Sequence, residues 1–378
     1  MQRRGREASL AFLFAALYGG YGALSPFLPA FLATRGLTAS EIATLLAAAM
    51  LVRLVAGPLV GRLADRRDAA SPLLAGALVL SALLTAAFLA KGGFVPLLAV
   101  ALAQAAATAP LAPLADTVAL AGRGGAAAYG RLRAAGSAAF IATTVLTGQL
   151  VASFGHGTGL ILGATLFVTA AAFTASRPVA ASACGPGAVG GFATLALDAR
   201  FRRLVLAAAL VIGAHAMHDA FAIIVWAAAG IGPRVAGLLW AEAVAAEVAV
   251  FLWLGPRLVA RIGSAHALML AAVAGALRWA VQAQTSALPA LILIQALHGL
   301  TFALLHLACL GLIADLVPDR RRATALTLYG TFGLGLASAL MTLAAGTLYE
   351  ALGVRGFWVM AAVSLSAVPV ARGLASVR

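Results

Sequence analysis

The first apolar run of the chain, at residues 8–33, reads ASLAFLFAALYGGYGALSPFLPAFLA. It contains no charged side chain, and a helix of about 20 mainly apolar residues is enough to cross a bilayer. Arginines precede the run, as in a secretory signal peptide, but the run continues to Arg35 and is too long for a cleaved signal. We therefore expect residues 8–33 to be the first membrane span.

Eleven similar runs follow along the chain, separated by charges, Gly and Pro. The sequence therefore predicts an all-α membrane protein with twelve transmembrane helices. The expected spans are residues 8–33, 40–60, 72–90, 94–119, 131–153, 159–176, 203–228, 235–254, 266–283, 287–314, 323–348 and 354–371.

The composition excludes a water-soluble enzyme. Hydrophobic residues make up 63% of the chain and charged residues only 10%, with a mean hydropathy of +1.02, whereas soluble domains are about 25% charged. The single lysine, Lys91, precedes Gly92 and not a Ser or Thr, so no GK[ST] phosphate loop exists. Cys184 and Cys309 support neither a disulfide framework nor a metal site. We expect no enzyme activity, no metal and no cofactor.

The formal net charge of +14 could indicate a nucleic-acid partner, but its distribution favours a lipid bilayer. With the N-terminus placed in the cytoplasm, the outer loops hold only Arg35, Lys91, Arg234 and Arg355. Arg53 and Arg278 fall inside spans, which leaves the remaining twenty of the 26 basic residues on the inner side. This predicts a multi-pass protein of the inner (cytoplasmic) membrane with both termini in the cytoplasm and no nucleic-acid partner.

The two halves of the chain resemble each other at an offset of 198 to 200 residues. The matching pairs are Gly57-Pro58 with Gly255-Pro256, Ala115-Asp116 with Ala314-Asp315, Tyr129-Gly130 with Tyr329-Gly330, Gly148 with Gly346, and Gly155 with Gly353. Because each half has six spans, both copies enter from the same side, which makes a parallel repeat. We expect an N-terminal half at 1–177, a cytoplasmic central linker at 178–202 and a C-terminal half at 203–378.

Between spans 2 and 3, residues 61–66 read GRLADR. This resembles the signature loop of the major facilitator superfamily, G-x-L-x-D-R followed by Gly and basic residues. The resemblance implies a gating role for Gly61, Asp65 and Arg66. The sequence departs from the pattern at residues 68–70, which read DAA.

Over the whole chain the sequence is similar to the phenylpropionate permease branch, which is itself similar to the lactose permease group of proton symporters. The stretches that carry this similarity include Tyr21-Gly22, Leu51-Val52-Arg53, Pro113-Leu114-Ala115-Asp116, Tyr129-Gly130-Arg131-Leu132-Arg133, Gly213-Ala214-His215, Ala246-Glu247-Val248, Arg278-Trp279 and Leu297-His298. The resemblance implies a monomeric transporter that takes up a small organic acid with protons by alternating access. The chain departs from the branch at Ala134-Ala135 and at His218-Asp219.

Ionisable side chains inside the membrane cost about 2.5–3.5 kcal/mol each on insertion scales and normally face a cavity or each other. This chain places there Arg53, Asp116, His215, His218, Asp219, Glu242, Glu247, Arg278, His298, His306 and Asp315. At about 1.5 Å per residue, His215, Glu247 and His298 all lie roughly 16–18 Å from the start of their spans. We expect these three near one plane, close to the membrane centre.

The resemblance to the lactose permease group implies that Glu247, Arg278 and His298 form a proton-coupling set, with His215 facing the same cavity. A nearby guanidinium favours the ionised form of a carboxylate, so moving it could load and release a proton. The alternative is a structural charge network that fixes helix register, with Glu242 as a further possible partner of Arg278. We expect His306 to be a satisfied interior histidine. A zinc site at His215 and His218 would need further ligands.

The first half offers mainly positive charge to the interior. We predict Arg53, Tyr21, Asp116 and Arg133 as substrate-binding residues, which favours an anionic or strongly hydrogen-bonding substrate. The alternatives are that Arg53 simply pairs with Asp116 and that the span 1 aromatics are ordinary packing.

Two other functions fit the same spans. An efflux antiporter for drugs or metabolites would move protons in the opposite sense. A non-transporting membrane assembly helper on the same fold need not keep ionisable residues at the midplane, so His215, Glu247 and His298 argue against it.

Overall fold

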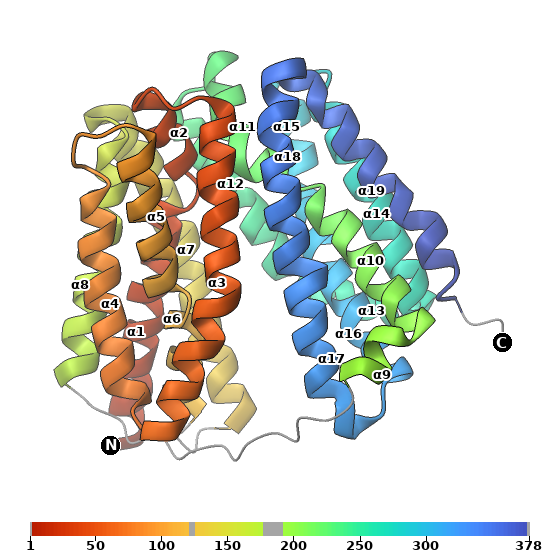
Figure 1. The fold of residues 1–378 in the computed structure, drawn as a ribbon, viewed down its shortest axis with the longest axis horizontal. Coiled ribbons are helices and arrows are strands. Elements are labelled where there is room, and N and C mark those ends of the chain that lie inside the picture. The colour runs from red at the N-terminus through yellow and green to blue at the C-terminus, as the bar shows by residue number, and fades with distance from the viewer. Residues whose placement is uncertain (1, 121–124, 177–191, 376–378) are drawn as a thin grey trace. The chain divides into compact units, whose positions relative to one another are not determined.

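The computed structural model describes residues 2–120, 125–176 and 192–375 (Figure 1). Within those residues the structure is helical, without strands. Eleven segments are long and apolar enough to cross a membrane, and the last of them, Asp319–Arg372, has 54 residues, which is enough for two crossings. A turn at Gly353, with φ of 57°, divides this last segment. The all-α fold with twelve predicted spans is therefore confirmed.

The chain divides into two compact units. Unit 1 consists of Met1–Gly185 with Trp226–Ala241, and unit 2 of Pro186–Val225 with Glu242–Arg378. The predicted linker at 178–202 lies mostly outside the described residues. Its described part forms a short helix, α9 (Phe192–Leu197), and the first turn of the next helix.

Unit 1 is built on eight helices of the first half. They are α1 (Gln2–Leu24), α2 (Leu28–Thr34), α3 (Ala39–Arg67), α4 (Ala70–Ala87), α5 (Phe94–Thr108), α6 (Leu111–Leu120), α7 (Gly125–Phe154) and α8 (Gly157–Ser176). Span 1 is split into α1 and α2 because Pro26 and Pro29 interrupt the backbone hydrogen bonds. A capping box between Thr38 and Glu41 then starts α3.

The second half contributes α10 (Ala199–Gly213), α11 (Ala216–Ala228), α12 (Pro233–Ala249), α13 (Gly255–Ile262), α14 (Ser264–Gln282), α15 (Leu288–Ala296), α16 (Leu305–Leu316), α17 (Arg322–Leu328), α18 (Ala337–Leu352) and α19 (Phe357–Arg372). Three π-helical segments lie within these spans, at Val250–Leu254, Leu300–Leu304 and Tyr329–Leu336. The Asp198 side chain caps α10 by accepting from the Phe201 amide at 2.7 Å.

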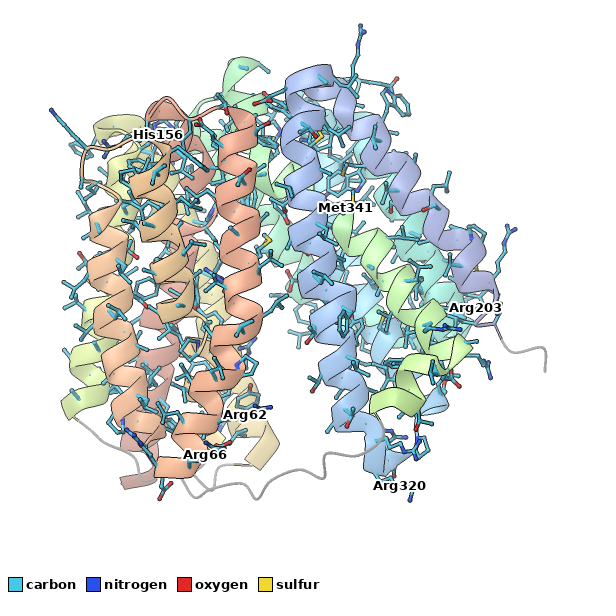
Figure 2. The ribbon with its side chains drawn as sticks, viewed as in Figure 1. Arg62, Arg66, His156, Arg203, Arg320 and Met341 are labelled. Carbon is cyan, nitrogen blue, oxygen red and sulfur yellow. The ribbon has the colours of Figure 1, made fainter. Side chains whose placement is uncertain are left out.

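Two predicted spans are longer than expected. Helix α3 continues through Pro58 to Arg67, and the corresponding span of unit 2 continues through Pro256 to Ile262. Prolines are tolerated in membrane helices. The GRLADR motif therefore forms the last turns of α3, with Arg62 and Arg66 at its end in Figure 2, and the turn begins at Asp68, whose φ is 49°.

Small residues let the helices of each unit approach closely. A Cβ built on Gly22 of α1 would lie 2.5 Å from the Phe140 carbonyl of α7, so only glycine fits there. In unit 2 a Cβ on Gly275 of α14 would lie 2.4 Å from the Ser364 hydroxyl of α19. The Gly213 Cβ position is similarly close to Met341, which Figure 2 labels on α18.

We predict that Gly22→Ala destabilises the protein by about 1–3 kcal/mol, because the new methyl group forces α1 away from α7. Thermal unfolding in detergent measures the change. Gly76→Ala in α4 is the matched control: nothing lies within 4 Å of its Cβ position, so its melting temperature should stay the same or rise slightly. Equal melting temperatures for the two variants would contradict the assigned contact.

Candidate functional site

Arg278 of α14 lies at the centre of a polar network inside unit 2. Its side chain is fully buried. Nη1 donates to His298 Nδ1 at 2.9 Å and to Thr301 Oγ1 at 3.3 Å, and Nη2 donates to Gln295 Oε1 at 2.9 Å. The guanidinium carbon also lies 4.5 Å from the ring centre of Trp279. These neutral acceptors form hydrogen bonds with the buried guanidinium, because a buried cation without hydrogen bonds would be costly.

His215 joins this network from a break in span 7. The break between α10 and α11 turns the ring inward, where Nδ1 lies 2.9 Å from the Val211 carbonyl and Nε2 lies 2.9 Å from Thr301 Oγ1. A carbonyl only accepts, so Nδ1 carries a hydrogen. Thr301 therefore connects His215 to Arg278.

His298 stands between Arg278 and Glu247. Because Arg278 Nη1 can only donate, His298 Nδ1 must accept, and the hydrogen of the neutral ring sits on Nε2. Nε2 faces Glu247 Oε2 at 3.6 Å, slightly beyond hydrogen-bond distance. The buried guanidinium thus selects the tautomer of His298 that points a proton toward Glu247.

Glycine and helix irregularity bring Glu247 and His298 together. A Cβ on Gly299 would lie 2.5 Å from the Ala246 carbonyl, so the two spans touch directly beside these side chains. The π-helical segments Val250–Leu254 and Leu300–Leu304 begin within three residues of Glu247 and His298. Such segments occur often at functional sites.

The network continues on the other side of Arg278. Gln295 Oε1 lies 3.2 Å from His218 Nε2, and His218 Nδ1 lies 3.3 Å from Asp219 Oδ1. His218 is buried, whereas half of the Asp219 side chain is exposed. A chain of contacts therefore runs from Asp219 through Arg278 to Glu247.

All four residues predicted for proton coupling, His215, Glu247, Arg278 and His298, thus lie in one network. Gln295 and Thr301 also belong to the network, and because they are uncharged they were not among the predicted residues. The sequence spacing does indicate a shared position, because Gln295, His298 and Thr301 recur every three residues and so share one face of span 10. Their contacts with Arg278 could not be read from that spacing.

A second polar cluster lies in unit 1. Arg133 of α7 donates to the Tyr18 hydroxyl of α1, and its Nη1 is 3.9 Å from Asp116 Oδ1 of α6. Tyr129 also hydrogen-bonds to Asp116. The Arg133 and Asp116 side chains are 46% and 30% exposed, so both remain accessible.

Tyr21 and Arg53, the other two residues predicted to bind substrate, have different contacts. The Tyr21 hydroxyl donates to the Thr108 carbonyl at 3.1 Å, and Arg53, an exposed residue of α3, interacts electrostatically with Tyr21. Asp116 has Arg133 as its ion-pair partner, not Arg53 as the alternative proposed. The residues predicted to gate, Gly61, Asp65 and Arg66, lie in the last turns of α3.

His306, expected to be a satisfied interior histidine, places Nδ1 3.1 Å from the Tyr329 hydroxyl. In the described part of the chain, no three His, Cys, Asp or Glu side chains gather as they would around a metal ion.

We predict that Thr301→Val destabilises the protein by about 1–3 kcal/mol, because it removes a hydroxyl that both Arg278 and His215 contact inside the protein. Thermal unfolding in detergent provides the measurement. Thr301→Ser keeps the hydroxyl and is the control, with a smaller loss. If Val were tolerated better than Ser at this position, the hydrogen bonds would not matter for stability.

Comparison with known proteins places the chain among transporters. The model of the MFS_1 like family matches residues 8–360. The probable 3-phenylpropionic acid transporter of Escherichia coli K12 is 34% identical over 374 residues, which cover 95% of each chain. The maltose permease of Geobacillus stearothermophilus is 27% identical over 352 residues, 91% of this chain and 88% of that one.

Solved structures share the fold. The crystal structure of the nucleoside transporter NupG in its D323A form matches with a TM-score of 0.88 at 17% identity, over 98% of this chain and 100% of that one. A bacterial homolog of the human lysosomal transporter Spinster matches with a TM-score of 0.78 at 13% identity, over 98% and 96%. At these identities the similarity shows the fold alone.

Proposed function

The chain belongs to the MFS_1 like family of major facilitator transporters, and we propose that it is a proton-coupled symporter that takes up a small organic acid by alternating access. Its relatives are transporters and not enzymes. The observation that carries the proposal is the contact chain Arg278–His298–Glu247, in which a histidine nitrogen lies 3.6 Å from a carboxylate oxygen.

Glu247 is the proposed proton carrier. In the geometry described, His298 directs its Nε2 hydrogen at Glu247, which suits an ionised carboxylate. Protonation of Glu247 supplies a second hydrogen to the same contact, so the contact must loosen or the proton must sit on the other carboxylate oxygen. In the first case, binding of a proton is linked to a local movement of span 8 against span 10.

The proposed substrate carries a carboxylate. Arg133 and Arg53 present exposed guanidinium groups in unit 1, and guanidinium groups bind carboxylates in a bidentate manner. Tyr21, Tyr18 and Asp116 surround them and could orient a ring or hydroxyl group. The 34% identical relative is named a probable transporter of 3-phenylpropionic acid, so aryl carboxylates are the first substrates to test.

We also propose the cellular arrangement that the arginine distribution predicts. The protein lies in the inner membrane with both termini in the cytoplasm and works as a monomer. Residues 1–177 and 203–378 are the two functional halves, with 178–202 as their cytoplasmic connection, and Gly61, Asp65 and Arg66 act in gating at the end of α3.

We predict that proteoliposomes with a pH-sensitive dye inside will acidify when 3-phenylpropionate is added outside, and that Glu247→Gln will abolish this proton entry because the amide cannot carry the proton. Radiolabelled substrate exchange at equal pH should persist in the variant, since exchange needs no net proton transfer.

Glu242→Gln, on the same helix α12, is the matched control and should couple normally. Normal coupling by Glu247→Gln would overturn the assigned carrier. Proton exit in place of entry would identify an antiporter.

We predict that Arg133→Lys raises the substrate KM about 10–100-fold with little change in maximal rate, because lysine loses the planar donor fork but keeps the charge. Uptake rates measured against concentration test this. Arg131→Lys is the matched control on the same helix, because Arg131 pairs with Glu7 at 2.6 Å on an exposed surface. If the two variants behaved alike, Arg133 would have no special role in binding.

A further inference from the structure

His218 and Asp219 form a pair that the symport scheme above does not use. The sequence departs from the related permease branch at these two positions. Both belong to α11, with His218 2% exposed and the Asp219 side chain 51% exposed. One face of the pair meets the buried network and the other is accessible.

Both ring nitrogens of His218 face oxygen atoms. Nδ1 lies 3.3 Å from Asp219 Oδ1, and Nε2 lies 3.2 Å from Gln295 Oε1. The identity of Oε1 follows from its second contact, because Arg278 Nη2 donates to the same atom at 2.9 Å. A flipped Gln295 amide would set a donor against the donor of Arg278, so the oxygen must face both side chains.

These contacts decide how many protons the pair holds. The Nε2 contact needs a hydrogen on Nε2, because Gln295 Oε1 can only accept. The Nδ1 contact needs a second hydrogen, on Nδ1 or on Asp219. A neutral imidazole beside an ionised carboxylate has only one hydrogen for the two contacts. With that hydrogen on Nε2, a lone pair of Nδ1 would face a lone pair of Asp219 Oδ1.

We propose that His218 and Asp219 are a second proton-binding site of the transporter, at which the pair jointly holds one exchangeable proton in the state that the structure describes. The proton can be drawn as imidazolium with carboxylate or as neutral ring with carboxylic acid. The two forms have the same proton count and no net charge, and the pair titrates as a unit. This site is distinct from Glu247 and His298, and its transport role rests on the proposed symport.

The groups that act on the pair from neighbouring elements are one guanidinium and two further histidines. From α14, the Arg278 guanidinium interacts with both members, and because its positive charge opposes an added proton, the proposed proton rests on the hydrogen-bond geometry and not on this charge. From span 10, His298 faces the pair with a neutral ring, and His215 interacts with Asp219. A buried imidazolium without a partner would be costly, whereas the neutral pair avoids that cost.

The test is nitrogen NMR on purified protein labelled at its six histidines, in lipid nanodiscs at pH 7.5. His218→Gln identifies the His218 signals, and if that variant fails to fold, Gln variants at the other five histidines assign them by elimination. Infrared spectra of wild type and Asp219→Asn detect a carboxylic acid at Asp219. His156→Gln, at the turn between α7 and α8, is the control and should leave the His218 signals unchanged.

The proposal expects one of two results. Either both nitrogens of His218 are protonated, and Asp219→Asn makes the ring neutral, or Nε2 alone is protonated and Asp219→Asn removes a carboxylic-acid carbonyl band. The proposal would be overturned if Nε2 of His218 carried no hydrogen. It would also be overturned if the ring were neutral and Asp219→Asn removed no carboxylic-acid band.

A second experiment measures the number of protons transported per substrate molecule. This number should fall by one in Asp219→Asn and in His218→Gln. An unchanged ratio in variants that still transport would overturn the transport role. If wild-type proteoliposomes show no proton movement at all, the symport proposal fails, while the spectra still decide whether the pair holds a proton.

Discussion

A guanidinium buried inside a membrane protein needs hydrogen-bond acceptors, and that requirement organises unit 2. Arg278 obtains its acceptors from one face of span 10, where Gln295, His298 and Thr301 succeed each other at three-residue intervals. Each of the three then contacts one further side chain: His298 faces Glu247 with its other nitrogen, Thr301 Oγ1 also contacts His215, and Gln295 Oε1 also contacts His218. One buried charge therefore selects the tautomer of His298 and connects polar side chains on four spans.

The packing that makes this possible is tight at two glycines. Gly275 lets α14 lie against α19, and Gly299 lets span 10 touch span 8 beside Glu247. The break at His215 and the π-helical segments beside Glu247 and His298 are irregular turns in otherwise regular helices. Backbone groups freed by such turns need other partners, so irregular turns inside the membrane are tolerated mainly where protein surrounds them. The irregular turns and the polar network thus occupy the same level of the unit.

The spans could be predicted from sequence because the bilayer imposes a length and a composition on each of them, and the predicted ends lie within a few residues of the helices at most positions. The exceptions have a local cause: α3 runs on to Arg67 because Pro58 does not stop a helix supported by neighbouring helices, and a basic helix end is stable outside the apolar layer. Of the ionisable residues predicted to lie inside the membrane, His215, His218 and Arg278 are buried in the protein, whereas Arg53, Asp219 and Asp315 are exposed. The hydrogen-bond partners of these residues could not be predicted, because a guanidinium can be satisfied equally by a carboxylate or by neutral oxygen and nitrogen atoms. Arg278 was considered a partner of Glu242 or Glu247, and its hydrogen bonds instead go to Gln295, His298 and Thr301.

The charge balance of the network connects proton binding to anion binding. With the shared proton on His218 and Asp219, that pair is neutral, and the charge of Arg278 is balanced by Glu247 through His298. A proton on Glu247 removes this balance and leaves one uncompensated positive charge in the interior of the unit. A carboxylate substrate restores neutrality, whereas a neutral solute does not. Under the proposed mechanism, the proton and the organic acid therefore favour each other's binding through electrostatics, without direct contact between them.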